Sequence, residues 1–330
     1  MLQIMKPVSF ELLSSSPSIR RERSDLSLCE LEARVLSADQ AAGRPGFRHT
    51  DAELIQIVPS RGSKEPRYFV QFVPNRASRP KHPSGCPICL PQVQSVEQSY
   101  AIIRVGSTDL AMLANPFAYM PSCITWAAAE DLPQRCGTEI DQSSWATVLM
   151  LMLNLCHQLG DHVVGFNELA GNSLDHLHLV SHKPIPGIGL YGVQQSATRL
   201  APSDRLSVFH LGAEQGYPID AWRIGLPDDQ EAVEAGTSLV AQWRSIGGPS
   251  ASANCAAVME DGHPVLYLFP RSTLLRAWGW SSSPAILEMM GVFIECDAEE
   301  MVHVRSGLWG HEHFSQILSS LRPPWLRCCD

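Results

Sequence analysis

The stretch GFNELAGNSLDHLHLVSH, residues 165–182, carries more information about fold and chemistry than any other part of the chain. Its second part, residues 175–182, has the alternating pattern that is typical of a strand. Because the side chains of a strand alternate between two faces, we expect the leucines to point into a core. The opposite face then carries His176, His178, Val180 and His182.

Three histidines on one strand face admit three interpretations. The face is solvated and happens to be rich in histidine, or it holds a structural metal ion, or it carries a nucleophile. Imidazole suits the third role, because its neutral form is populated near neutral pH and its attack on an α-phosphate divides one difficult displacement into two easier steps. The preceding turn, Gly171, Asn172 and Ser173, offers backbone N–H groups and a hydroxyl to phosphate oxygens.

The rest of the sequence predicts short strands with a few covering helices. We predict strands at 68–73, 99–105, 109–114, 124–126, 162–166, 255–259, 265–269 and 292–294, and helices at 141–159, 228–245 and 285–290. We expect a helical or irregular lead-in over residues 1–65. Runs of strands with few helices are typical of an α+β fold with an antiparallel sheet, and not of a doubly wound parallel sheet.

Composition restricts the class of protein. The 330 residues are 45% hydrophobic and 18% charged, which is enough apolar mass for a substantial core. A net charge of −9 argues against a nucleic-acid-binding surface, which needs clustered Lys and Arg. The most apolar stretch, residues 145–156, is shorter than the ~20 residues that span a bilayer. We therefore expect a cytoplasmic protein with no nucleic-acid or membrane partner, whose ten cysteines are mostly free thiols.

The pattern Gly171-x-Ser173-x-x-His176-x-His178 resembles the signature of galactose-1-phosphate uridylyltransferase and its relatives, the transferase and phosphorylase branch of the histidine-triad superfamily. Within that branch the motif looks most like the GDP-hexose phosphorylases. The resemblance implies a histidine-triad-like α+β fold of two pseudo-repeated halves, with a lead-in over 1–65, a catalytic half over 66–200 and a second half over 201–330. It also implies a homodimer.

The resemblance implies a covalent nucleotidyl–histidine intermediate on His178, with Ser173 assisting and His176 supporting the nucleophile or binding zinc. A nucleotide sugar or related nucleotide would be the substrate, and phosphate or a sugar phosphate the acceptor, with no required cofactor. The expected substrate-binding residues are Asn167, Gly171, Asn172, Asp175, His182, Lys183, Asn115, Phe117, Arg76 and Arg271. For Lys183 and Arg76, a solvated side chain is the alternative.

One position departs from the family. Two residues after the nucleophile the family has His or Gln, and this chain has Val180. The loss of one hydrogen-bond donor at a transition state costs about 3–4 kcal/mol. Two alternatives therefore stay open: a nucleotide hydrolase on the same scaffold, and a diverged protein that binds a nucleotide or metal without catalysis.

Cys86-x-x-Cys89 has the spacing of zinc ligands, although a single such pair is a weak signal. In the uridylyltransferases this pair binds zinc together with the first histidine of the motif, which is His176 here, and one upstream histidine. No histidine stands at the upstream position, near Glu130 and Asp131. Asp131, Glu130 or Cys123 could replace it, or the cysteines are simply buried.

Overall fold

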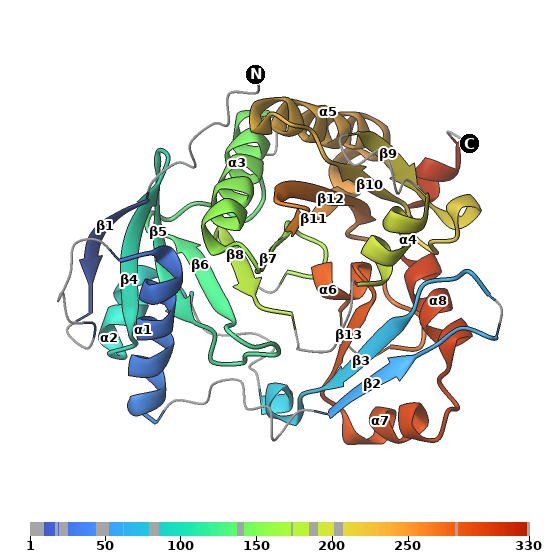
Figure 1. Cartoon of the computed structure of the whole chain (residues 1–330), viewed down its shortest axis with the longest axis horizontal. Helices are drawn as coiled ribbons and strands as arrows, with labels where there is room; N and C mark the ends of the chain where they lie inside the picture. The colour runs from blue at the N-terminus through green and yellow to red at the C-terminus, as the bar shows by residue number, and fades with distance from the viewer. Residues whose placement is uncertain are drawn as a thin grey trace.

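The computed structural model describes residues 10–16, 19, 26–43, 53–61, 63–78, 86–136, 142–172, 174–184, 191–200, 207–280 and 283–328. Within these ranges the chain is an α+β molecule with one large and one small sheet (Figure 1). This confirms the fold class expected from the alternating strands. No helix in the described ranges is long and apolar enough to cross a membrane.

The large sheet has ten strands, and its neighbouring strands are antiparallel throughout. In spatial order they are β1 (Phe10–Ser15), β4 (Tyr100–Val105), β5 (Thr108–Ala114), β6 (Ile124–Ala128), β8 (His178–His182), β7 (Val163–Asn167), β11 (Ala251–Glu260), β12 (His263–Ser272), β10 (Ala221–Ile224) and β9 (Val208–Leu211). The strands from before residue 200 therefore meet those from after it at the β7–β11 pair.

Three helices cover one face of this sheet: α1 (Leu28–Ala41), α3 (Gln142–Leu159) and α5 (Asp229–Gly247) (Figure 1). The helix α5 begins where expected, because the side chain of Asp228 accepts hydrogen bonds from the first backbone N–H groups of the helix. Apolar side chains of the three helices pack on those of the strands, among them Trp126, Phe166 and Leu179.

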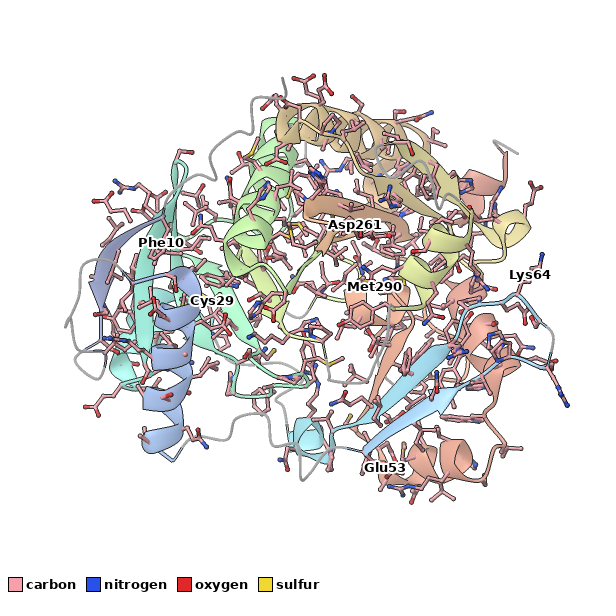
Figure 2. All side chains as sticks on the ribbon, viewed as in Figure 1. Phe10, Cys29, Glu53, Lys64, Asp261 and Met290 are labelled. Atoms are coloured by element: carbon pink, nitrogen blue, oxygen red, sulfur yellow. A yellow bond between two sulfur atoms is a disulfide. The ribbon has the colours of Figure 1, made fainter. Side chains whose placement is uncertain are left out.

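The opposite face is covered by the small sheet β13 (Val292–Glu295), β3 (Tyr68–Phe72) and β2 (Glu53–Ile57), and by short helices. The helices are α4 (Gly192–Leu200), α6 (Ile286–Met289), α7 (Ala298–Arg305) and α8 (His311–Ser320). Side chains fill the space between the two sheets, where Met290 is fully buried (Figure 2). A smaller apolar cluster lies under α2 (Leu90–Ser95), on β5 and β6.

The structure corrects three expectations about local structure. The histidine strand begins at His178 and not at residue 175, because residues 175–176 form a bend. The lead-in contains strands β1 and β2, which pair with β4 and β3. The pair β13–β3 is parallel, so the small sheet is mixed. The lead-in strands were missed because their sequences, FELLSS and ELIQI, are short and partly polar.

Candidate active site

The histidine strand β8 presents its two faces as the alternation predicts. Leu179 and Ser181 are buried towards the helices, and the Trp126 indole N–H donates to the Ser181 hydroxyl at 2.7 Å. The other face carries His178, Val180 and His182, of which His178 and Val180 are half-buried and His182 is buried. His176 precedes the strand, so it does not belong to this row, and its side chain is buried elsewhere.

The tautomer of His178 is set by the backbone. Its Nδ1 lies 2.8 Å from the carbonyl oxygen of His176. Because a carbonyl only accepts, Nδ1 must carry a proton, and in the neutral imidazole the lone pair then lies on Nε2. Nε2 is therefore the ring nitrogen that can act as a nucleophile.

Two asparagines on the next two strands lie on the same sheet face as His178. Asn167 ends β7 and is directly opposite Asn254 on β11. The Asn167 side-chain oxygen accepts from the Ile286 N–H at the start of α6, at 2.8 Å. Gly165 permits this close approach, since a Cβ atom there would lie 2.8 Å from the Ile286 side chain. Asn254 was not predicted, because its strand lies about ninety residues further along the chain.

The turn before β8 is shaped by its glycine. Gly171 has a φ of +83°, and a Cβ atom on it would lie 2.5 Å from the carbonyl oxygen of Pro284. The Asn172 side chain bonds the backbone of Leu174 at both its amide nitrogen and its oxygen, which closes the turn. Asp175 is exposed. Ser173, expected to assist catalysis, lies outside the described residues.

Arg271 lies on β12 and its side chain is almost fully buried. One guanidinium nitrogen, Nη1, donates to the Pro284 carbonyl at 3.1 Å, and the buried Nε has no hydrogen-bond partner among the described residues. Burial lowers the pKa of Arg271 to about 10, although the nearby Glu288 acts in the opposite direction. Glu288, which the sequence did not single out, is also buried and accepts from the N–H groups of Ala285 and Ile294.

The segment that follows β5 joins two of the expected binding residues to β8. The Asn115 side chain accepts from the Phe117 N–H, and the Phe117 carbonyl accepts from Arg76 at 2.9 Å. The Arg76 guanidinium lies 4.7 Å from the centre of the Tyr119 ring, which contacts the ring of His182 edge-on. Asn115, Phe117 and Arg76 therefore form one connected group beside His182.

Lys183 lies at the far end of β8 from His178. Its ammonium group is 3.5 Å from the carboxylate of Asp161, and the side chain is 42% exposed. Five residues of extended chain separate Lys183 from His178, which is roughly 16 Å.

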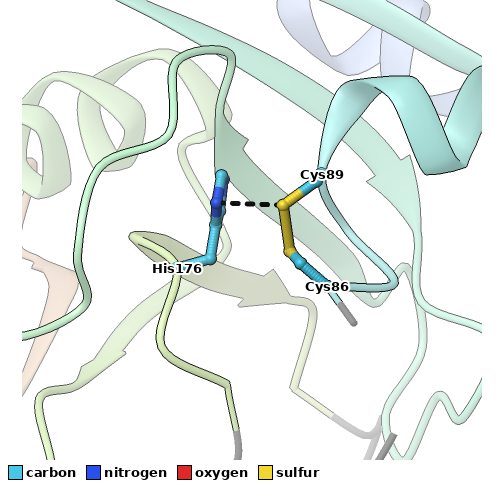
Figure 3. A group of neighbouring side chains, drawn as sticks. All are labelled: Cys86, Cys89 and His176. Carbon is cyan, nitrogen blue, oxygen red and sulfur yellow. Dashed lines mark hydrogen bonds between the residues drawn. A yellow bond between two sulfur atoms is a disulfide. The ribbon is translucent and has the colours of Figure 1, made fainter. Parts of the chain in front are cut away.

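Potential metal ligands are gathered at Cys86, Cys89 and His176, whose ligand atoms lie within 4.8 Å of one another (Figure 3). The two sulfur atoms are joined in a disulfide, whereas six further cysteines in the described part of the chain are free thiols. His176 Nε2 donates to the Ala128 carbonyl at 2.9 Å, so the lone pair lies on Nδ1, 3.4 Å from the Cys89 sulfur. Asp131 Oδ1 is 3.6 Å from the same nitrogen. Once the disulfide is reduced, the two thiolates and the imidazole nitrogen form a donor set that suits zinc.

Only the comparison with solved structures found proteins that are similar to this chain. Neither the family models nor the curated proteins gave a match. Yeast Ap4A phosphorylase Apa2 in complex with Ap4A superposes with a TM-score of 0.62 at 16% sequence identity, over 88% of this chain and 95% of that chain. The same enzyme in complex with AMP gives a TM-score of 0.62 at 15% identity, over 89% and 95% of the chains.

A DUF4931 family protein from Bacillus cereus is a more distant neighbour, with a TM-score of 0.34 and 11% identity over half of this chain. The likeness to Apa2 spans nearly the whole of both chains, so it concerns the complete architecture and not one motif. The chain therefore shares its overall fold with Apa2, and this likeness is consistent with the fold that the motif around His178 implied.

Proposed function

We propose that this protein is a nucleotidyltransferase of the phosphorylase type, which works through a covalent nucleotidyl intermediate on His178. The observation that carries the proposal is the hydrogen bond from His178 Nδ1 to the His176 carbonyl, since it places the ring lone pair on Nε2. The neighbour Asn167 is half-buried and gives the same face a polar group that suits phosphate.

In the first step, Nε2 of His178 attacks the α-phosphorus of the nucleotide. A P–N bond forms as the bond from phosphorus to the bridging oxygen breaks, and that oxygen leaves with the electron pair. The imidazole keeps its Nδ1 proton, so the adduct is cationic at the ring. The His176 carbonyl stabilises this charge, because a hydrogen bond to an ionised group is stronger than a neutral one.

In the second step, an oxygen of inorganic phosphate or of a sugar phosphate attacks the same phosphorus. The P–N bond breaks, Nε2 recovers its lone pair, and the nucleotide leaves with the acceptor attached. We propose a dinucleoside polyphosphate or a nucleotide sugar as the substrate. The Apa2 structures with Ap4A and AMP support a nucleotide ligand on this fold. Arg271, which lies on β12 opposite Ser252 and so two residues along from the position opposite Asn254, would bind a distal phosphate.

The test is a turnover assay with Ap4A and with nucleotide sugars, in the presence and absence of phosphate. We expect product formation to require phosphate or a sugar phosphate and to fall by at least about a thousandfold in His178→Asn, the order of loss when a covalent nucleophile is removed. His263→Asn is the matched control, because His263 is exposed at the start of β12. Product release without phosphate would show a hydrolase instead, and nucleotide binding without turnover would show a non-catalytic protein.

A further inference from the structure

The ladder between β7 and β8 stops just before it reaches the nucleophile. Its last pairs are Val163 with His182, Val164 with Ser181 and Gly165 with Val180. In an antiparallel register, two further steps would place Asn167 opposite His178. That pair is not formed by the backbone, so another group must satisfy the His178 N–H and the Asn167 carbonyl.

The side chain of Gln134 takes this place. The His178 N–H donates to Gln134 Oε1 at 2.7 Å. The Gln134 amide nitrogen donates to the Asn167 carbonyl at 2.6 Å and to the His178 carbonyl at 3.2 Å. One buried amide thus replaces the missing rung and separates the strand ends by its own width. Gln134 is fully buried, so water does not compete for these bonds.

The segment around Gln134 is itself held in place from both sides. The Leu132 carbonyl accepts from the Leu177 N–H at 2.7 Å, which ties the segment to the residue before His178. On the other side, Arg244 of α5 donates to the Cys136 carbonyl at 2.7 Å and forms an ion pair with the buried Glu168, which follows Asn167. Gln134 is therefore fixed relative to both strand ends that it joins.

We infer that Gln134 is a positioning residue, whose amide holds His178 and Asn167 at the separation that admits a phosphoryl group between their side chains. The inference rests on the function proposed above. His178 and Asn167 lie on the same sheet face, so a direct backbone rung would draw their side chains together. The inserted amide keeps the strand ends apart and still satisfies their backbone groups.

The first experiment uses Gln134→Met, which keeps the size of the side chain and removes the amide. The matched control is Gln194→Met, a buried glutamine on α4. We expect hydrogen exchange of the His178 amide to accelerate at least about tenfold in Gln134→Met and to stay unchanged in the control. The rate of adduct formation should fall about 100-fold, the cost of roughly 1 Å of misplacement, while the KM for the nucleotide stays near the wild-type value.

The second variant, Gln134→Glu, tests the role even if the methionine variant does not fold. A protonated glutamic acid can still donate to the Asn167 carbonyl, but the carboxylate cannot. Burial raises the pKa of a carboxyl group, so this donor is lost only as the pH rises. We expect the adduct-forming rate of Gln134→Glu, relative to wild type, to fall as the pH is raised, a profile that a merely structural role would not give.

The outcomes separate the two proposals. Unchanged exchange at the His178 amide in Gln134→Met, or a pH profile of Gln134→Glu that parallels wild type, would overturn the positioning role and leave the phosphorylase proposal standing. A wild-type protein that forms no adduct with any nucleotide would overturn the phosphorylase proposal. The exchange measurement would still show whether Gln134 holds His178.

Discussion

His178 and His182 share one face of β8, yet their surroundings give them different chemistry. His178 is half-buried, and the backbone sets its tautomer. His182 is fully buried beside Tyr119, and burial lowers its pKa to about 4, with His162 adding to the shift and a hydrogen bond to the Lys183 carbonyl opposing it. His182 is therefore neutral at pH 7 and suited to packing rather than to holding an anion by charge.

The depressed pKa of His182 makes stability depend on pH. The unfolded chain binds a proton at this residue near pH 6.5, whereas the folded chain does so only near pH 4. The stabilisation is thus complete above about pH 6.5 and is lost as the pH falls towards 4, by roughly 1.4 kcal/mol per unit. We expect His182→Asn to flatten the fall in unfolding free energy over this range.

The measurement for this prediction is urea unfolding at several pH values between 4 and 7. Carboxyl groups also titrate there, so the quantity to follow is the difference between wild type and variant. His263→Asn should show no such difference, because its side chain is exposed. A His182→Asn curve that stays parallel to wild type would contradict the account of this residue.

At the scale of the elements, the short helix α6 lies directly on β7 because Gly165 has no side chain. A Cβ atom there would lie 2.8 Å from Ile286 Cγ2, while Ile286 N donates to the Asn167 side chain. We expect Gly165→Ala to destabilise the protein by about 1–3 kcal/mol through overpacking. Because Ile286→Ala removes the Cγ2 atom, the double variant Gly165→Ala with Ile286→Ala should lose less stability in thermal unfolding than the sum of the two single losses. Two independent, additive losses would argue against the contact.

The loop that carries Cys86 and Cys89 lies beside the bend that precedes β8, which contains His176. We propose that the reduced cysteines bind one zinc ion together with His176 and Asp131, in a structural role. Elemental analysis after reduction and zinc loading should find about one ion per chain, and Cys86→Ser with Cys89→Ser should abolish it. Cys123→Ser is the control, because that thiol is buried and separate from the group. Unchanged zinc content in the double variant would contradict the site.

At the scale of the whole molecule, the ten-stranded sheet joins its two parts at β7 and β11, where Asn167 faces Asn254. We propose that the two pseudo-repeated halves meet near residue 200. The candidate site then lies at the junction, because the second part of the chain supplies Asn254, Arg271 and α6 to the face that carries His178.

The sequence predicts those features of the structure that depend on residues close together in the chain. The alternation of residues 178–182, the turn glycine and the histidine spacing depend on neighbours in the chain, so the strand and the site face could be predicted. Gln134, Asn254 and Glu288 could not, because their roles arise only when distant segments meet in the sheet. The bend at His176 was missed for the same reason, since its ring bonds the carbonyl of Ala128.

The most direct test of the central claim is the intact mass of the protein after incubation with Ap4A or nucleotide sugars and no acceptor. We predict a gain of one nucleoside monophosphate, located by peptide mapping at His178, absent in His178→Asn and lost when phosphate is added. The absence of any adduct with every nucleotide, or an adduct that persists in His178→Asn, would contradict the account.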